Sequence, residues 1–214
     1  MTDSVVTAAA PSRTRSLDAT DLARVAVFAA IIAVLGLPGG FTIFGAVPIT
    51  AQTLGVMLAG AILGPWLGAL SVTVVLTLVA VGLPLLAGGR GGMAVFLGPS
   101  AGYLMGWIVG AIVIGLIVQA GGRKPVLWRT FAGVVTGGIL VVYAIGIPVQ
   151  SVVTRLPLAE TALTSLVFLP GDLVKAILAT AIVTTLVKAY PRAFRREWTR
   201  QPVAPPAATP SHVP

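Results

Sequence analysis

The chain has 214 residues, of which 57% are hydrophobic and only 9% are charged, and its mean hydropathy is +1.00. Soluble globular domains carry about 25% charged residues, so this composition excludes that class and indicates an integral membrane protein. The net charge of +8 comes from basic residues that flank apolar runs, which argues for orientation in a membrane and against nucleic-acid binding.

Six apolar windows bounded by glycine, proline or charge predict an all-α integral membrane protein with six transmembrane helices. The windows cover residues 22–37, 51–64, 68–86, 101–120, 130–147 and 171–189. Prolines stand at many of the boundaries, as expected of a residue that lacks the N–H needed inside a helix. The second window is short for a span, so we expect a tilted or protein-buried helix there.

The segments that flank these windows differ from them in composition. Residues 1–21 place their arginines after a small apolar stretch, which is not the order of a secretory signal, so we expect a disordered cytoplasmic leader. Residues 191–214 are first basic and then rich in proline, and we expect a cytoplasmic tail. The membrane domain is therefore predicted to occupy residues 22–190.

Most of the basic residues lie in three places: around the start of the first window, between the fourth and fifth windows, and after the sixth. With six spans, all three places fall on one side of the membrane. The positive-inside rule makes that side the cytoplasm. The sequence therefore predicts a multi-pass protein of the plasma membrane with both termini in the cytoplasm.

The first window repeats alanine at a spacing of four. Ala26 precedes Ala30, and Ala29 precedes Ala33, at that interval. Small residues at this spacing let membrane helices approach closely. The pattern fits packing within the chain and docking onto another subunit equally well.

Polar residues also precede or interrupt the middle windows. Thr50 and Gln52 enter the short second helix, where helix capping is the simpler explanation for Thr50. Arg90 stands among four glycines after the third window, and it could hold a carboxylate or a carbonyl group, or be a solvated arginine in a flexible turn. Tyr103 and Trp107 lie one turn apart and suit a ligand site, a core or an interfacial belt.

The sixth window, LPGDLVKAILATAIVTTLV, carries Asp172 and Lys175 three positions apart. Pro170 and Gly171 predict that a helix begins here, and a carboxylate in a first turn with a local ion pair would then be a structural feature. Alternatively, ionisable residues at membrane depth mark a ligand path. A cyclic urea would satisfy both residues, with its N–H groups on Asp172 and its carbonyl on Lys175.

Several chemistries are absent from the sequence. It has no cysteine, and its one histidine, His212, lies in the proline-rich tail. No phosphate-binding loop of the G-x-x-x-x-G-K-[ST] type and no H-E-x-x-H or G-x-S-x-G motif occurs. We therefore expect no catalytic residues, no metal and no cofactor, and any uphill transport must draw its energy from a partner.

Three segments together carry a family resemblance. They are VPITAQTLGVMLAGAILGPWLGALSV (47–72), GLPLLAGGRGGMAVFLGPSAGYLMGW (82–107) and LPGDLVKA (169–176). In this order they resemble the BioY family, the biotin-specific substrate-capture (S) components of energy-coupling factor (ECF) transporters. Two departures are GPSAGY, where GPTGGY is more usual, and PLLAGG, where PVFAGG is more common.

The resemblance implies a six-helix S-component fold with one biotin site near the outer face. It implies that Asp172 and Lys175 bind the ligand and that Arg90 contributes from the glycine loop. It further implies association with a transmembrane coupling subunit and two ATPase subunits, with the alanines of the first helix as the docking face. We also count Tyr103, Thr50 and Gln52 among the candidate site residues.

Other functions remain open at this point. The chain could be an S component for another small vitamin. It could also be an intramembrane enzyme that uses Asp172 as an acid or base with Lys175 tuning it, although a nucleophile or metal set is not evident. A purely structural subunit would hold the same pair without binding a ligand.

Overall fold

The computed structural model describes residues 17–37, 47–48, 50–120, 125–191 and 194, and the elements in this part of the chain are helical. In chain order they are α1 (Ala19–Val34), α2 (Gln52–Leu63), α3 (Pro65–Ala80), η1 (Met93–Phe96), α4 (Ala101–Val118), α5 (Leu127–Val135), η3 (Thr136–Val141), α6 (Val142–Thr154), α7 (Leu158–Ser165), η4 (Leu166–Phe168) and α8 (Leu169–Ala189). Of these, η1 and η4 are 3-10 helices and η3 is a π-helical turn. Most of the predicted leader and tail lies outside the described residues.

Several of these elements join end to end. The helices α5, η3 and α6 form one apolar helix of 28 residues, and α7, η4 and α8 form one of 32 residues. With α4, these are the three helices in the described residues that are long and apolar enough to cross a membrane, while α2 and α3 are shorter apolar helices. With α1, they account for the six predicted segments and confirm an all-α membrane fold.

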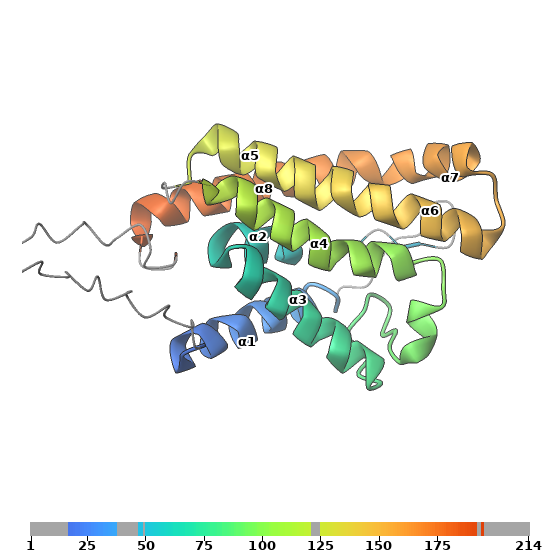
Figure 1. Ribbon diagram of the computed structural model, residues 1–214, viewed down its shortest axis with the longest axis horizontal. Helices are drawn as coiled ribbons and strands as arrows, with labels where there is room; N and C mark the ends of the chain where they lie inside the picture. The colour runs from blue at the N-terminus through green and yellow to red at the C-terminus, as the bar shows by residue number, and fades with distance from the viewer. Residues whose placement is uncertain (1–16, 38–46, 49, 121–124, 192–193, 195–214) are drawn as a thin grey trace, which may run out of the picture.

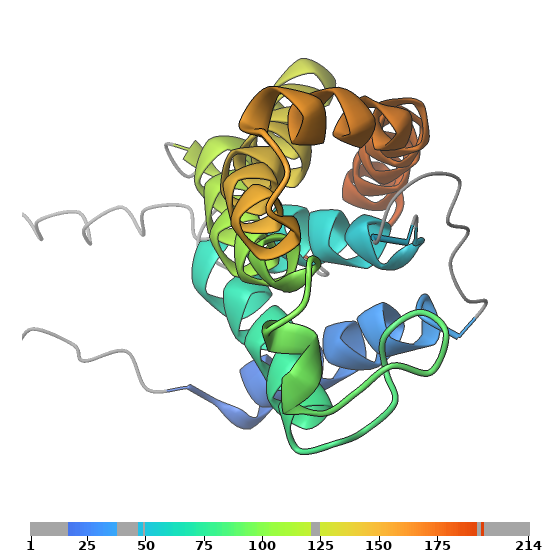
Figure 2. The same cartoon turned by 90° about the vertical axis from the view of Figure 1, so that its right-hand side faces the viewer.

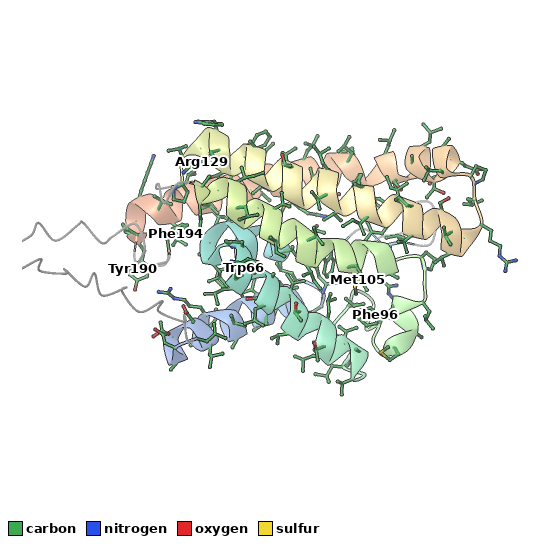
Figure 3. All side chains as sticks on the ribbon, in the orientation of Figure 1. Trp66, Phe96, Met105, Arg129, Tyr190 and Phe194 are labelled. Carbon is green, nitrogen blue, oxygen red and sulfur yellow. The ribbon has the colours of Figure 1, made fainter. Side chains whose placement is uncertain are left out.

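The helices run roughly along one long axis. Figure 1 shows α6 continuing the line of α5, with α4 beside them and α1 to α3 below. The end of the bundle that holds the start of α1 and the finish of α8 is called the terminal end here, and the opposite end the distal end. Figure 2 shows α1 at one side of the bundle, with α2 and α3 between it and the α4 to α8 group. In Figure 3, Arg129, Tyr190 and Phe194 gather at the terminal end, whereas Phe96 lies in the distal half.

The short second helix is buried in protein, as predicted. Ten of its 12 residues are buried. It turns back into α3 at Gly64, whose φ of +86° favours glycine, and Pro65 then occupies the first turn of α3, where its missing N–H costs nothing. The side-chain amide of Gln119, at the end of α4, donates to the Ile62 carbonyl at 3.3 Å and so satisfies an end group of α2.

Glycines bring α4 close to its neighbours. A Cβ on Gly110 would lie 2.6 Å from the Gly137 carbonyl oxygen, and one on Gly106 would lie 3.1 Å from the Val142 Cα. Larger side chains at these positions would push the helices apart. Such contacts between small residues are a main source of helix association in membranes, where the hydrophobic effect between helices is weak.

Helical structure extends beyond two of the predicted windows. The sixth predicted helix is α8, which begins at Leu169 with Pro170 and Asp172 in its first turn, as expected. Because α7 and η4 run directly into it, helical structure reaches back to Leu158, and this first turn is not a free helix start. The fifth helix likewise passes through Pro148 and ends at Thr154, followed by Arg155 in the left-handed conformation with a φ of +59°.

Candidate ligand-binding site

A cavity opens in the distal half of the bundle, between α2, the glycine loop, α4, the start of α6 and the start of α8. The empty space in it, counted out to the mouth and including open solvent, is about 610 Å³. Its lining residues are Val47, Pro48, Thr50, Gln52, Thr53, Leu86, Arg90, Ser100, Tyr103, Leu104, Trp107, Gly138, Val142, Tyr143, Phe168, Asp172 and Lys175. All six residues predicted from the sequence to bind the ligand lie on this wall.

Asp172 and Lys175 form the polar centre of the cavity. The Lys175 ammonium group lies 2.8 Å from Asp172 Oδ1, and the two side chains are only 14% and 9% exposed. Tyr143 donates a hydrogen bond of 2.7 Å to Asp172 Oδ2. Lys175 also donates to the Thr53 hydroxyl at 3.0 Å. Three different helices, α2, α6 and α8, therefore hold this pair in place.

The pair keeps capacity for a ligand. An ammonium group has three donors, and Lys175 uses two of them on Asp172 and Thr53. Each carboxylate oxygen of Asp172 accepts one hydrogen bond and can accept another. The site can therefore offer one donor and two acceptor positions side by side.

Arg90 reaches the cavity from a hairpin built by glycines. Leu86 and Arg90 exchange two backbone hydrogen bonds, of 3.0 and 3.2 Å, around a turn in which Gly88 and Gly89 have φ values of +75° and +70°. The Arg90 Nε group donates to the Ala87 carbonyl at 3.2 Å. The glycine loop is thus a defined turn with an arginine on the cavity wall.

Gln52 and Thr50 shape the wall from the start of α2. Gln52 is 1% exposed, and its amide donates to the Leu85 carbonyl at 3.0 Å and to the Ile32 carbonyl at 3.3 Å. Its Oε1 accepts from the Ala87 N–H at 3.2 Å. The amide of Gln52 therefore ties α1 and the glycine hairpin to α2. Thr50 accepts from the Gln52 N–H at 3.3 Å, but it precedes the N-cap residue Ala51, so the capping role considered for Thr50 is not observed.

Aromatic rings form much of the apolar wall. The Tyr103 ring packs edge to face against Tyr143 and Phe168, with centroids 6.3 and 6.4 Å away. Its hydroxyl turns to Gln150 at 2.8 Å and Ser165 at 3.0 Å, so the ring, rather than the hydroxyl, lines the cavity. Trp107, one turn further along α4, is 5% exposed and lines the cavity as well.

Sequence reasoning missed Tyr143, Thr53 and Gly138. Tyr143 is one of only three tyrosines in the chain and stands inside an apolar window, which was an available signal. Thr53 follows Gln52 directly, but nothing in its neighbourhood distinguished it. Gly138 lies in the π-helical turn η3, and such turns are frequent at functional sites but leave no clear pattern in a sequence.

Two charged side chains of the distal end and the candidate docking alanines of α1 lie away from the cavity. Arg155 and Glu160 are exposed at the distal end and do not line the cavity. On α1, Ala26 and Ala30 are exposed and Ala33 is partly exposed. Ala29, in contrast, is 5% exposed and belongs to the core, so it does not share their surface. Among the described residues, no group of three or more His, Cys, Asp or Glu side chains could hold a metal ion.

Known proteins share the sequence pattern and the fold of this chain. A sequence model described as the BioY family matches residues 9–192. The chain belongs to the BioY family. It is 47% identical to the biotin transporter BioY of Rhodobacter capsulatus over 162 residues, which cover 72% of this chain and 85% of that protein. It is also 47% identical to the biotin transporter BioY of Rhizobium etli over 167 residues, or 74% and 88% of the two chains.

A solved structure is similar to this BioY-family chain throughout its fold. It is the 2.1 Å crystal structure of the S-component for biotin from an ECF-type ABC transporter. The TM-score is 0.75 at 35% sequence identity, and the match covers 84% of this chain and 100% of the other. The six-segment bundle is therefore an S-component fold.

Proposed function

We propose that this protein is the substrate-specific S component of an ECF-type ABC transporter and that it binds biotin for import. The observation that carries the proposal is the cavity that the largely buried Asp172–Lys175 pair shares with Arg90 and a wall of aromatic rings. Its family supports the same function, since relatives of nearly half identical sequence are biotin transporters.

The polar centre of the cavity suits the ureido ring of biotin. This ring has two N–H donors and one carbonyl acceptor. The two ureido N–H groups donate to the free acceptor positions of Asp172, and the third N–H of Lys175 donates to the ureido carbonyl. Hydrogen bonds to charged groups are worth about 1.5 to 3 kcal/mol each, so three of them make a large part of the affinity of a small ligand.

The apolar wall suits the rest of the bicyclic ring system. Trp107, Phe168 and the ring of Tyr103 offer aromatic surface to the thioether ring. Thioether sulfur makes favourable contacts with aromatic rings, worth about 0.3 to 1.5 kcal/mol. Thr50 and Gln52 also belong to the wall of the cavity. Gln52 contributes by holding the hairpin that carries Arg90.

Energy for import comes from partner subunits, because the chain carries no phosphate-binding loop of its own. The partners are a transmembrane coupling subunit and two ATPase subunits. The coupling subunit docks on the small residues of α1 that reach the surface, which are the exposed Ala26 and Ala30 and the partly exposed Ala33. Ala29 is excluded from this surface because it packs inside the protein.

The protein lies in the lipid bilayer of the plasma membrane with its distal end outward and its termini in the cytoplasm. Basic residues support this orientation, since Arg24, Arg129 and Lys188 belong to helices that start or finish at the terminal end. The cavity then opens toward the outside, where a transporter for import collects its substrate.

Titration calorimetry of the purified protein with biotin tests the proposal. We expect tight binding, and we expect Asp172→Asn to weaken it by at least about tenfold, which is 1.4 kcal/mol. Competition with thiamine, riboflavin and folate measures the specificity. Absence of biotin binding, or displacement of biotin by one of these vitamins at equal concentration, would contradict the proposal.

A further inference from the structure

Below the polar centre of the cavity, toward the terminal end, the bundle continues with small residues and a methionine. Lys175 donates to Thr53 within the polar centre. Four residues later on the same two helices come Met57, on α2, and Ala179, on α8. Residues four apart lie one above the other on a helix face. Met57 and Ala179 therefore belong to the next layer of the bundle, and both are completely buried there.

Gly138 belongs to the same layer and comes from the π-helical turn η3. It lines the cavity, whereas Met57 lies behind it and is 0% exposed. Apart from its own helix, the three atoms nearest to a Cβ on Gly138 would all belong to Met57, with Cε at 2.7 Å, Cγ at 2.8 Å and Sδ at 3.5 Å. Because glycine has no side chain, the Met57 side chain is the next group below the ligand space at this point.

Met57 fills space that its small neighbours leave open. Glycine and alanine add little or nothing beyond the backbone, whereas methionine has a long unbranched side chain that fits irregular gaps. A bundle collapses only partly around a deleted side chain, so truncation of Met57 would leave an apolar space next to the cavity. Spaces of this kind stay dry and can take an apolar group of a ligand.

We propose that Met57 is the floor of the cavity and determines the size of the ring system that the protein accepts. One extra methyl group in a closed apolar pocket changes binding by about 10- to 200-fold, so a fixed floor is an effective filter. The hydrogen bonds of Asp172 and Lys175 recognise donors and acceptors but do not measure the bulk around them. This inference rests on the proposed biotin binding and adds a residue that limits which cyclic ureas fit.

Ring-enlarged analogues of biotin test the inference. Biotin, 2-thiobiotin and N-methylbiotin are titrated into the wild-type protein and into Met57→Ala, since the two analogues enlarge the ureido ring at its carbonyl and at a nitrogen. A hydrogen bond that an analogue loses is lost in both proteins, so the ratio of biotin affinity to analogue affinity reports on space. We expect this ratio to fall by at least about tenfold in Met57→Ala for one analogue or both. An unchanged ratio for both analogues would overturn the inference.

Ile62→Ala is the matched control, because Ile62 lies in the same apolar core, further along α2 from the cavity, and is 4% exposed. It removes a side chain of similar size and should lower the unfolding midpoint, as Met57→Ala does, without changing the ratio. Met57→Val is a smaller truncation that should give an intermediate ratio, and it serves if Met57→Ala does not fold. An equal change of the ratio in Ile62→Ala would show that discrimination follows general stability, which contradicts a floor at Met57.

The floor can also be raised from the opposite helix. Gly138→Ala adds a methyl group at the Met57 contact, so one of the two side chains must take space from the cavity. We expect this variant to bind biotin at least about tenfold more weakly than the wild type. The double variant Met57→Ala/Gly138→Ala should bind biotin more tightly than Gly138→Ala alone, because groups in contact do not act additively. Unchanged binding in Gly138→Ala, or no recovery in the double variant, would overturn the inference. If the wild type did not bind biotin at all, the proposed function itself would fail.

Discussion

The two halves of α8 lie in opposite surroundings. Near the distal end, Asp172 and Lys175 face a cavity and bond to α2 and α6. One turn later, α8 enters a closely packed apolar core, where Ala176, Ala179 and Val183 are completely buried. The other buried residues of this core, here called the terminal core, are Met57, Leu58, Ala61, Ile62, Ile114, Val118, Val134, Ile139 and Phe194.

This difference separates the half of the bundle that has room for a ligand from the half that is filled by packed side chains. Both halves are built from apolar membrane helices, but small residues let the helices close completely around the terminal core. The cavity ends where this packing begins. A polar ligand would have to displace apolar side chains to continue toward the terminal end, so passage requires a rearrangement of the protein or of its assembly.

The largest effect is expected from substitutions that break the polar pair of the distal half, Asp172 and Lys175. Asp172→Asn or Lys175→Met alone leaves one buried charge without its partner, which costs about 3 to 5 kcal/mol in other buried pairs. We expect a loss of thermal stability and a loss of biotin affinity of at least about tenfold. The double variant Asp172→Asn/Lys175→Met should recover much of the stability, because no charge is left unpaired, but none of the affinity.

Thermal unfolding in detergent and titration calorimetry of the three variants separate these effects. A pair that only stabilises the fold would give a double variant that binds biotin as the wild type does. In that case both halves of α8 would contribute to stability alone, and neither would bind the ligand.

The next prediction disturbs the terminal half. A Cβ on Gly115 would lie 2.5 Å from the Gly64 carbonyl carbon, and this backbone cannot yield without opening the turn between α2 and α3. We expect Gly115→Val to lower the free energy of unfolding by about 1 to 3 kcal/mol, as overpacking does. The folded fraction should bind biotin with unchanged affinity. Ala144→Val is the control, because Ala144 is exposed on α6.

A drop in affinity equal to that of the polar variants would show that the two halves are coupled. Unfolding midpoints and dissociation constants measured on the same preparations decide this.

The sequence predicted the fold and the polar centre because each leaves a strong local signal. Apolar windows mark the spans, and charges within them are rare enough that Asp172 and Lys175 stand out. The fifth window closed before Pro148, whereas the helix continues through this proline to Thr154. The sixth helix was predicted to begin at Pro170, and α8 begins at Leu169, but helical structure reaches back through η4 and α7 to Leu158. Local rules for proline do not tell which helical segments continue in a folded bundle.

Contacts between distant segments left no such signal. Tyr143 and Thr53 meet the pair only because α6 and α2 pack against α8, and the second hydrogen bond of Lys175 joins residues 122 positions apart. The alanines of α1 also required the structure, since spacing alone did not separate the buried Ala29 from the exposed Ala26 and Ala30.

Tyr143 provides a finer test of the distal half. Tyr143→Phe removes the hydrogen bond of 2.7 Å to Asp172 and leaves the ring in the wall. A bond to a charged group contributes about 1.5 to 3 kcal/mol, so we expect biotin affinity to fall about tenfold or more. Tyr103→Phe is the matched control, because the Tyr103 hydroxyl bonds to Gln150 and Ser165 outside the cavity. It should lower stability more than affinity, and the opposite ranking of the two variants would contradict the assignment.

The smallest expected effect concerns Thr53, which holds Lys175 from α2. Thr53→Val keeps the shape of the side chain but removes the acceptor of the 3.0 Å hydrogen bond. Lys175 retains Asp172, so we expect only a loss of about two- to fivefold in biotin affinity, or roughly 0.4 to 1 kcal/mol. Thr73→Val is the matched control, because the Thr73 hydroxyl bonds to the Ala69 carbonyl of its own helix, away from the cavity. If both variants bind biotin like the wild type, Lys175 is positioned by Asp172 alone, and α2 contributes to the site only through Gln52.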